Sequence, residues 1–487
     1  MPATLVASKT RDQASNALKE LTKAALPNAM IEHPLVDRSN AANMQNFCRY
    51  SRLIESLIDN QRVTGHVSPI GKQRIRASGR CTLKILVHDY AGHPFQVDLS
   101  RELASRGHQV THAYFHGDHG PKGRLHRTSS DPAGLSFKGV SLPRPYDKTS
   151  FVKRRFDDVA YGKAVAQLVL ALKPDLVISG NTPTEAQSAI VKASRKSGAS
   201  FVFWVQDFYS IAASKLLQKK MGAVGAGIGA YYSYLERGQF ANSDAIVVIT
   251  DSFADVAKKW VSAKDKVFTI ENWGTLNEIS PLPKDNDWAL RHGLGGTFNF
   301  LYSGTLALKH NPQLLVELAK QVKGQANVVV VSQGVGVSEL ERAKNEQSID
   351  NLILLPLQPF ADLPKVLATS DVTVATIEPD AGMFSVPSKV QSYFCAQRPV
   401  LLAAPAENLA SQVVRKNGAG IVVDPTDKGG FLRSAIQLMK DDALRIGAAE
   451  SGRKFALNNY DIKRVTDRFE TVFQYAIDAR DVRKGTS

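Results

Sequence analysis

From residue 83 onward, the apolar residues gather in short uninterrupted runs, and polar residues do not alternate with them inside a run. Runs of this kind are typical of strands that are covered on both faces, as in parallel sheets. Amphipathic stretches with helical spacing separate the runs. The expected strands are 83–88, 109–115, 176–179, 201–205 and 245–250, and the expected helices are 94–106, 159–172 and 184–197. The first half of the chain therefore predicts a parallel α/β sheet with helices on both faces.

The pattern stops between residues 271 and 294, where turn formers such as Asn272, Gly274 and Pro281 dominate, and then it begins again. The expected strands of the second half are 298–302, 327–331, 352–354, 372–375, 400–402 and 420–423, and its expected helices are 312–322, 337–345, 363–368, 387–396 and 408–416. A helical tail runs from 431 to about 479. Two successive α/β sheets predict two Rossmann-like domains that face a cleft, with the interrupted segment as their hinge.

Residues 1–80 follow no such pattern and carry 12 Lys and Arg against 6 Asp and Glu. One amphipathic helix is expected at 46–58. We interpret this segment as a partly disordered basic extension, either solvated or in contact with lipid or nucleic acid. The chain then divides into the extension 1–80, a first domain 81–275, a second domain 276–455, and a C-terminal helix and tail 456–487.

Composition narrows the class of protein. The chain has 487 residues and a net charge of +15, which favours acidic partners such as phosphate-bearing substrates, anionic lipid or nucleic acid. Its three cysteines form no Cys-x-x-Cys pair, so neither a zinc site nor a disulfide framework is predicted. No apolar stretch reaches membrane-spanning length and no secretory signal stands at the start, so we expect a cytoplasmic protein.

Ligands of open parallel sheets bind beyond the carboxyl ends of the strands, so the loops that follow strands are the candidate sites. Gly92 and His93 lie in the first such loop, where Pro94 opens a helix whose amide groups can meet an anion or a sugar hydroxyl. A plain turn residue is an equally good interpretation of His93. Asp207 follows the strand at 201–205 and either contacts substrate or caps the next helix.

The loop 302–312 is the best candidate for binding phosphate. Gly304 lets backbone amides approach a ligand, and Lys309 stands just ahead of the helix that Asn311 and Pro312 begin. A lysine in that place opposes the helix dipole by a few tenths of a kcal/mol, and an anion between the two would reverse the sign. The alternative is a solvated lysine on a loop.

Two further loops follow strands of the second half. The loop 382–389 offers small residues, hydroxyls and Lys389 at a helix start. Glu407, in the loop 403–408, either accepts from ribose hydroxyls or complements the helix dipole. His-Glu-x-x-His, Gly-x-Ser-x-Gly and Walker A patterns do not occur, which argues against metal-dependent hydrolysis, serine hydrolysis and P-loop chemistry.

Taken in order, these loops resemble those of the family 4 glycosyltransferases of GT-B fold, in particular the bacterial cell-surface polysaccharide branch of colanic-acid and O-antigen type. The segments that carry the resemblance are 92–95, 99–104, 204–207, 272–273, 302–306 with Lys309 and His310, and 386–389. Each is short, and it is their order after predicted strands over roughly residues 83–480 that is specific. The resemblance implies two Rossmann-like domains, an acceptor domain followed by a donor domain, with a C-terminal helix that returns to the first.

The resemblance also implies an activity. Such an enzyme moves a sugar from a nucleotide-sugar donor to an acceptor with retention of the anomeric configuration, and it needs no metal and no cofactor. By analogy, the catalytic residues are Lys309, Lys389, His93 and Asp207. The donor-binding residues are Gly92, Gly304, Thr305, Gln333, Leu355, Pro356, Leu357, Pro387, Ser388, Glu407 and Asn408. Lys309 is expected on the donor phosphates, and His93 and Asp207 are expected to face the transferred sugar.

The sequence departs from the family pattern at two places. Thr305 stands where many relatives have an arginine, and 382–392 lacks the glutamates that many relatives carry there, with Glu378 upstream and Glu407 downstream. Lys389 is expected to supply the second cation, and Glu407 to bind ribose. A catalytically silent member is therefore an alternative.

The expected acceptor is a lipid-linked saccharide in polysaccharide biosynthesis, at the inner face of the plasma membrane. The basic, aromatic-rich stretch 211–240 suits an anionic bilayer surface, although an ordinary packed helix explains it equally well. Two other hypotheses stay open: a non-catalytic sugar- or nucleotide-binding accessory protein, and a GT-B sugar-nucleotide epimerase. We expect no nucleic-acid partner, because no basic motif interleaved with aromatic residues is present.

Overall fold

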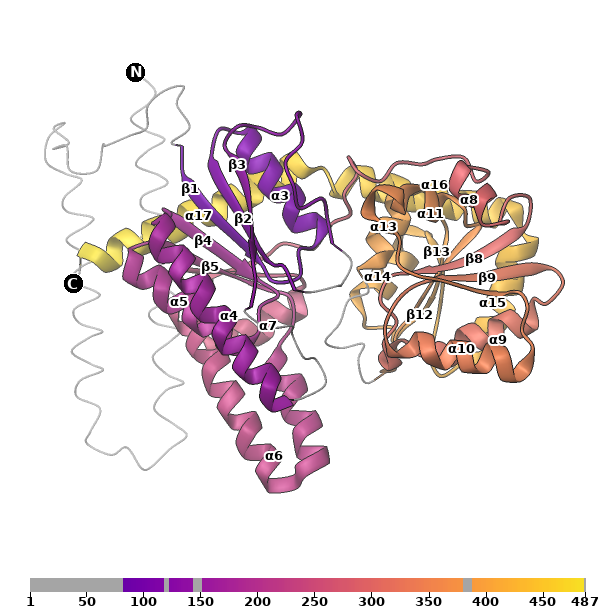
Figure 1. Ribbon diagram of the computed structural model, residues 1–487, viewed down its shortest axis with the longest axis horizontal. Helices are drawn as coiled ribbons and strands as arrows, with labels where there is room; N and C mark the ends of the chain where they lie inside the picture. Colours follow the sequence, from indigo (N-terminus) through magenta and orange to yellow (C-terminus); the bar gives the residue numbers. More distant parts are fainter. Residues whose placement is uncertain (1–81, 118–121, 143–150, 380–387, 486–487) are drawn as a thin grey trace, which may run out of the picture. The chain divides into compact units, whose positions relative to one another are not determined.

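The computed structural model describes residues 82–117, 122–142, 151–379 and 388–485, which belong to one compact unit, Cys81–Ser487 (Figure 1). The expected basic extension and its helix at 46–58 lie outside the described residues. Two parallel sheets, one after the other along the chain, form the framework of this unit. The two predicted Rossmann-like domains are therefore confirmed.

The first sheet has seven strands in the order β3-β2-β1-β4-β5-β6-β7, and every pair is parallel. Its strands are β1 (Lys84–Asp89), β2 (Gln109–Phe115), β3 (Leu135–Val140), β4 (Leu176–Gly180), β5 (Ser200–Val205), β6 (Ala245–Val248) and β7 (Val267–Thr269). Its helices are α3 (Pro94–Ser105), α4 (Phe151–Leu172), α5 (Thr184–Ser197), α6 (Tyr209–Asn242) and α7 (Asp251–Trp260), followed by a turn of 3₁₀ helix, η2 (Lys264–Lys266). The strand order reverses between β1 and β4, which is where such sheets bind ligands.

The second sheet has six parallel strands in the order β10-β9-β8-β11-β12-β13, with its reversal between β8 and β11. Its strands are β8 (Phe298–Ser303), β9 (Ala326–Val331), β10 (Leu352–Leu355), β11 (Val372–Thr376), β12 (Val400–Ala403) and β13 (Gly420–Val423). Its helical segments are η3 (Leu308–His310), α9 (Pro312–Gln321), α10 (Val335–Gln347), η4 (Phe360–Asp362), α11 (Leu363–Ala368), α13 (Lys389–Cys395) and α14 (Leu409–Asn417).

The continuous apolar runs are buried, as their pattern predicts. In β5 and β11 every residue is buried, because helices cover both faces of the sheets. Two strands of the first sheet were not expected. β3 is an edge strand in which exposed and buried positions are mixed, and β7 has only three residues, so neither produces an apolar run.

The segment between the sheets, expected to be a linker in which turn formers dominate, contains one short helix, α8 (Asp287–Arg291). The Asn286 side chain caps this helix by accepting hydrogen bonds from the amides of Trp288 and Ala289 at 3.0 and 3.1 Å. The Trp288 side chain is buried in the apolar core. A tryptophan among turn formers was the available signal for this packed helix.

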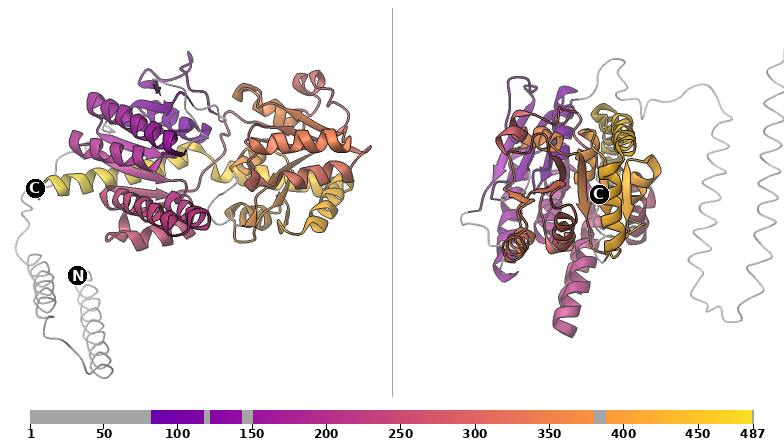
Figure 2. Two further views of the ribbon diagram at one scale, coloured as in Figure 1. Left: turned by 60° about the horizontal axis from the view of Figure 1, so that its bottom comes forward. Right: turned by 90° about the vertical axis from the view of Figure 1, so that its right-hand side faces the viewer.

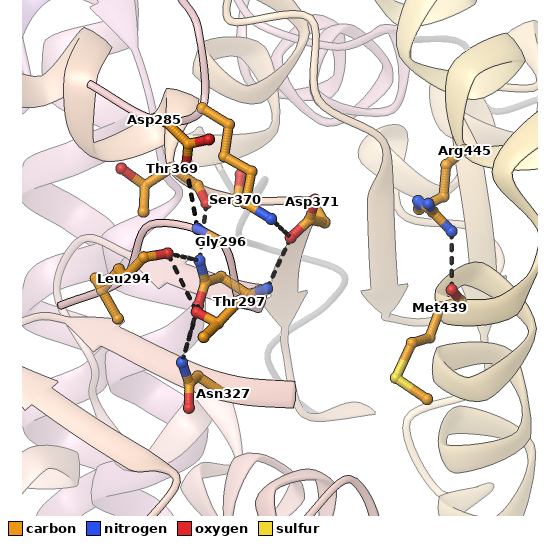
Figure 3. A network of polar contacts seen from close by, with 12 residues as sticks. Asp285, Leu294, Gly296, Thr297, Asn327, Thr369, Ser370, Asp371, Met439 and Arg445 are labelled. Atoms are coloured by element: carbon orange, nitrogen blue, oxygen red, sulfur yellow. Dashed lines mark hydrogen bonds and ion pairs between the residues drawn. The ribbon is translucent and has the colours of Figure 1, made fainter. Parts of the chain in front are cut away.

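A polar network surrounds the amino-terminal ends of the central strands of the second sheet (Figure 3). The Asp371 carboxylate accepts from the Asn299 amide at 2.8 Å and from the Lys284 ammonium at 2.7 Å. Asn327 donates to the Thr297 hydroxyl at 3.0 Å, and that hydroxyl donates to the Leu294 carbonyl at 3.1 Å. These side chains hold the incoming chain to the sheet, so the polar residues at this end are structural.

The helical tail consists of α15 (Lys428–Lys440), α16 (Asp442–Asn459) and α17 (Ile462–Gly485). α17 packs against α3, β5 and β6 of the first domain. Arg106 donates to Asp467 at 2.6 Å and to Glu470 at 2.8 Å, and the rings of Phe469 and Trp204 lie 4.8 Å apart. The expected return of the C-terminal helix to the first domain is confirmed.

The stretch 211–240 forms a helical hairpin instead of one helix (Figures 1 and 2). The helical backbone of α6 is broken at Gly222, whose φ of 55° and ψ of −129° lie outside the helical region. The two arms lie so close that a Cβ atom added at Gly225 would stand 2.0 Å from the Leu217 carbonyl oxygen. Glycine in the second arm therefore permits the arms to pack against each other.

Candidate active site

The loop after β1 is held by a buried carboxylate. The Asp89 side chain, fully buried at the end of the strand, accepts hydrogen bonds from the amides of Ala91, at 3.1 Å, and His93. Gly92 between them has a φ of 73°, in the left-handed region that favours glycine. This geometry places His93 as the residue that precedes α3, with its side chain partly exposed.

The His93 ring contacts the loop after β4, the neighbouring strand at the reversal of the sheet. Its Nδ1 atom lies 3.0 Å from the side-chain amide nitrogen of Asn181 and 3.4 Å from a carboxylate oxygen of Asp89. Asn181 has a φ of 50°, a conformation that asparagine tolerates better than most residues. The two loops at the reversal are therefore joined through His93, and sequence reasoning missed Asn181 as its partner.

Asp207 lies between β5 and α6, and it does not cap the helix. The amides of Tyr209 and Ser210 at the helix start donate to the buried Glu236 carboxylate, at 3.1 and 3.2 Å, and the Ser210 hydroxyl donates to it at 2.5 Å. Since Glu236 on the returning arm fills the capping role, the Asp207 carboxyl remains available for another one.

The electrostatic surroundings of Asp207 link it to two other predicted site residues. Its side chain is solvent-exposed, but protein atoms surround it densely, and this desolvation raises the pKa of Asp207 to about 6. Lys309 and His93 oppose the rise through their charges. Lys309 and His93 are thus both close enough to influence Asp207, although the two lie 216 positions apart along the chain.

The loop after β8 is built around Gly304, with a φ of 115°. The Gly304 carbonyl accepts from the Ser332 hydroxyl at 2.6 Å, and the Thr305 carbonyl accepts from the Tyr302 hydroxyl at 3.0 Å. The side chain of Thr305 is exposed. A side chain larger than hydrogen at position 304 would be strained by the backbone conformation, which explains the glycine.

Lys389, the first residue of α13, lies directly against this loop. A Cβ atom added at Gly304 would stand 3.5 Å from the Lys389 Cε atom, and the ammonium of Lys389 is 3.6 Å from the centre of the Tyr302 ring. Burial and, secondarily, the charge of Lys309 lower the pKa of Lys389 well below its ordinary value. The two predicted phosphate-binding lysines therefore lie together beyond β8.

His310 belongs to the same cluster, although only the motif resemblance had drawn attention to it. Its Nδ1 atom accepts from the Ala307 amide at 3.1 Å. Burial and the charges of Lys389 and Lys309 lower the pKa of His310 to about 3, so this ring is neutral at physiological pH. The neutral imidazole adds no positive charge to the two lysines.

The chain beyond β11 is joined to the cluster by two hydrogen bonds. The Glu378 amide donates to the Lys309 carbonyl at 2.8 Å, and the Thr376 hydroxyl donates to the His310 carbonyl. β8 and β11 are the strands on either side of the reversal in the second sheet. The lysine-bearing loop thus occupies the position where open α/β sheets bind their ligands.

The remaining predicted donor residues follow other strands of the second sheet. Gln333 follows β9, Leu355 ends β10, and Pro356 and Leu357 come next, with Pro356 exposed. The Ser332 amide donates to the Leu355 carbonyl at 2.9 Å, which joins the β9 and β10 loops. These residues share the carboxyl edge of the sheet with Gly304, and their contact with a base stays a prediction.

Three of the predicted donor-binding residues, Ser388, Glu407 and Asn408, lie at the starts of α13 and α14. Pro387 lies outside the described residues. Ser388 is exposed and precedes α13. Asn408 is buried and caps α14, because its side chain accepts from the Ala410 amide at 3.0 Å. The exposed Glu407 adjoins it, with its carbonyl accepting from Gln412 at 3.2 Å.

Sequence reasoning also missed an amide pair beside Asp207. Gln206 and Asn272 exchange hydrogen bonds through their side chains, at 2.6 and 3.3 Å. Both residues stand in segments that the resemblance singled out, which was the only signal for the pair. Among the described residues, no three His, Cys, Asp or Glu side chains gather in a way that could hold a metal ion.

Two family models match the chain, one for each domain. Residues 93–273 match the model described as "Glycosyl transferase 4-like domain", and residues 297–441 match "Glycosyl transferases group 1". His93 and Asp207 lie in the first matched range, and Lys309 and Lys389 in the second. The matches cover the whole second sheet and every strand of the first sheet except β1.

Individual proteins agree with these models. A protein of Pseudomonas aeruginosa named "Probable glycosyltransferase WbjE" is 22% identical over 289 residues, which are 57% of this chain and 69% of that protein. Anabaena HepE, solved in complex with UDP-glucose, superposes with a TM-score of 0.59 at 13% identity over 80% of this chain and 99% of its own. WaaG, described as a glycosyltransferase involved in lipopolysaccharide biosynthesis, gives a TM-score of 0.58 at 14% identity over 80% and 99%. With both of its domains matched in order, this chain belongs to the family 4 glycosyltransferases of GT-B fold.

Proposed function

We propose that this glycosyltransferase transfers a sugar from a nucleoside diphosphate sugar to a lipid-linked saccharide, with retention and without a metal ion, in the synthesis of a cell-surface polysaccharide. The observation that carries the proposal is the pair of lysines beyond β8, where burial and Lys309 lower the pKa of Lys389. Burial and the nearby charge of Lys309 both disfavour the charged form of Lys389, and an anion bound beside them would favour it. A diphosphate is such an anion.

The proposed chemistry breaks the bond between the anomeric carbon and the diphosphate oxygen, and it forms a bond from that carbon to an acceptor oxygen. Negative charge grows on the departing diphosphate while the sugar becomes oxocarbenium-like. In this proposal Lys309 and Lys389 stabilise that charge, and electrostatic stabilisation of this kind is usually the largest catalytic contribution. The proton of the acceptor hydroxyl leaves with the diphosphate.

His93 and Asp207 act on the sugar in this proposal. Asp207 carries its negative charge above a pKa of about 6 and lies near Lys309, so it can accept hydrogen bonds from sugar hydroxyls beside the phosphates. His93, held by Asp89 and Asn181, presents a ring whose orientation is fixed before the donor arrives. The UDP-glucose in HepE supports a nucleotide-sugar donor, and WaaG supports a role in surface polysaccharide synthesis.

The test begins with the donor. The full chain is heated with UDP, GDP, dTDP and their sugars, and a true donor at 100 times its dissociation constant should stabilise the protein by about 2.7 kcal/mol. Transfer to a lipid-linked saccharide is then followed by NMR, which reads the anomeric configuration of the product, in buffer with and without EDTA. Stabilisation by no nucleotide would refute the donor assignment. An inverted product, or activity lost in EDTA, would refute retention or metal independence.

A further inference from the structure

The hairpin of α6 ends in a turn that exposes two large apolar side chains. Val224 is 65% exposed and Met221 is 49% exposed, and they stand on either side of Gly222. Val224 and Met221 are two of the eleven large hydrophobic side chains that are exposed in the described parts of the chain, and α6 supplies five of these eleven. The other three are tyrosines that lie nine or more positions from Gly222, so Met221 and Val224 form the exposed apolar surface of the tip.

The same hairpin has a strong excess of positive charge. Between Asp207 and Glu236 there is no acidic residue, whereas the sequence places Lys215, Lys219 and Lys220 there. Lys215 and Lys219 are exposed on the first arm. At a rise of 1.5 Å per residue they lie roughly 3 to 9 Å from Met221 along the arm. Cations at that height above an apolar tip match the separation of lipid head groups from the acyl chains, since interfacial helices enter by roughly 5–10 Å.

The hairpin projects from the first domain (Figures 1 and 2), and its two arms pack closely against each other. Its arms are packed through Gly225 and Gly229, where an added Cβ atom would stand 2.0 Å from the Leu217 carbonyl oxygen and 2.6 Å from the Ser214 hydroxyl. At its base, Glu236 on the second arm holds the amides that begin the first. The tip lies roughly 20 Å from Asp207 along the first arm.

We propose that the tip of the α6 hairpin, formed by Met221–Val224 with Lys215 and Lys219 above it, inserts into the head-group region of an anionic lipid bilayer. The occupant of this surface is lipid because the apolar tip and the lysines are ordered along the axis of the hairpin, as the acyl and phosphate layers of a membrane are. This contact would bring a membrane-bound acceptor to the site at the base of the hairpin. That role rests on the proposed function.

None of the described helices is long and apolar enough to cross a bilayer. In the proposed contact, Met221 and Val224 supply the apolar part of the affinity and Lys215 and Lys219 supply the electrostatic part. Removing either set should weaken binding in a recognisably different way.

The experiment is flotation of the full chain with vesicles of pure phosphatidylcholine and with vesicles that contain phosphatidylglycerol. The double variant Met221→Asp/Val224→Asp should bind anionic vesicles at least tenfold more weakly than the wild type. Lys215→Gln/Lys219→Gln should lose the preference for anionic lipid. The matched control is Val482→Asp on α17, where the valine is 69% exposed, and it should float as the wild type does.

Three outcomes would overturn the proposal: no flotation of the wild type with either vesicle, undiminished flotation of the tip variant, or an equal loss in the Val482→Asp control. Self-association of the wild type that the tip variant lacks, without flotation, would identify a second copy as the occupant instead. Donor binding by the tip variant, measured by thermal shift, separates the membrane contact of the hairpin from the proposed glycosyl transfer. A variant that binds donor but not vesicles supports the hairpin, and a wild type that binds vesicles but no nucleotide sugar refutes only the proposed function.

Discussion

Lys309 and Lys389 illustrate how single residues of this site depend on one another. Lys389 is the first residue of α13 and Lys309 lies in η3, yet both reach the space beyond β8, where Tyr302 provides a ring under the Lys389 ammonium. The ring offers a partial electrostatic partner, although it does not neutralise the charge. A bound diphosphate would neutralise it.

Replacement of Lys309 by alanine should lower kcat by ~10²–10³, because it removes a fixed cation from the charge that develops on the diphosphate, a loss of about 3–4 kcal/mol. Lys309 also lowers the pKa of Asp207, so the variant should move the acidic limb of the pH–rate profile to higher pH. Steady-state kinetics over pH 5–9 measure both effects. Lys323→Ala, at an exposed lysine beyond α9, is the control. A variant within a factor of a few of the wild type would exclude Lys309 as a phosphate ligand.

Donor binding should be accompanied by proton uptake at Lys389. In the free protein the lowered pKa of Lys389 means that its ammonium loses the proton at a lower pH than an ordinary lysine does, whereas a bound diphosphate favours the charged form and raises the pKa again. Affinity should therefore fall as pH rises. Titration calorimetry in two buffers of different ionisation enthalpy counts the protons, and Lys389→Ala should abolish the uptake. Equal heats in both buffers for the wild type would contradict this account.

Strands and helices of this chain were predictable to the extent that they have an apolar pattern of their own. β2, α5, α11 and β13 occupy the expected residues, because two covered faces leave a continuous apolar run and one covered face leaves a helical period. The edge strand β3 and the short β7 leave no such trace. The break of α6 at Gly222 was not predictable either, since the glycines of the second arm act through their contact with the first.

The base of the α6 hairpin depends on one carboxyl group. Glu236→Ala should lower the free energy of unfolding by about 1–3 kcal/mol, because the amides of Tyr209 and Ser210 and the Ser210 hydroxyl lose their acceptor. Glu236→Gln keeps one acceptor oxygen and should lose less. Urea denaturation of the three proteins measures this order. Equal stability of wild type and alanine variant would show that water replaces the carboxylate without cost.

At the scale of the whole molecule, the chain between the sheets is tied into the first domain. The Trp273 indole stacks on Trp204 with ring centres 5.9 Å apart, and it donates to the Asp98 carboxylate of α3 at 3.2 Å. Trp273 also lies 5.9 Å from Phe469 of α17. The amino-acid sequence indicated that turn formers surround Trp273, but the pairing of Asp98 with a residue 175 positions later follows only from the fold.

The sequence allowed single site residues to be predicted in their loops, but it did not show which of these residues contact one another. Gly92, Gly304 and Lys309 could be singled out because each follows a strand and precedes a helix, which is a local property. That Lys389 lies against Gly304, and that Glu236 instead of Asp207 caps α6, are consequences of long-range packing. A single sequence contains no direct trace of such contacts, so the partners Asn181 and Tyr302 were missed.

Asp98 makes the stability of the folded chain depend on pH. Burial raises its pKa from 3.8 to about 7, against the opposing hydrogen bond from Trp273. The folded state therefore holds a proton that the unfolded state releases, and this contribution to stability is complete below pH 4 and disappears as pH rises through 7. Asp98→Asn keeps an oxygen for the Trp273 indole and carries no charge, so it should remove this pH-dependent contribution, which amounts to about 4 kcal/mol between pH 4 and 8.

The measurement is urea denaturation at four pH values between 5 and 8, with the exposed Asp255→Asn on α7 as the control for loss of a carboxylate. As pH rises, the free energy of unfolding should fall more for the wild type and the control than for Asp98→Asn. At pH 8 the Asp98→Asn protein should be the most stable of the three. Because Trp273 adjoins both Trp204 and Phe469, its fluorescence can report the same transition. Parallel pH profiles for all three proteins would mean that Asp98 ionises in the folded state as readily as in the unfolded chain, and that the hydrogen bond to Trp273 compensates fully for burial.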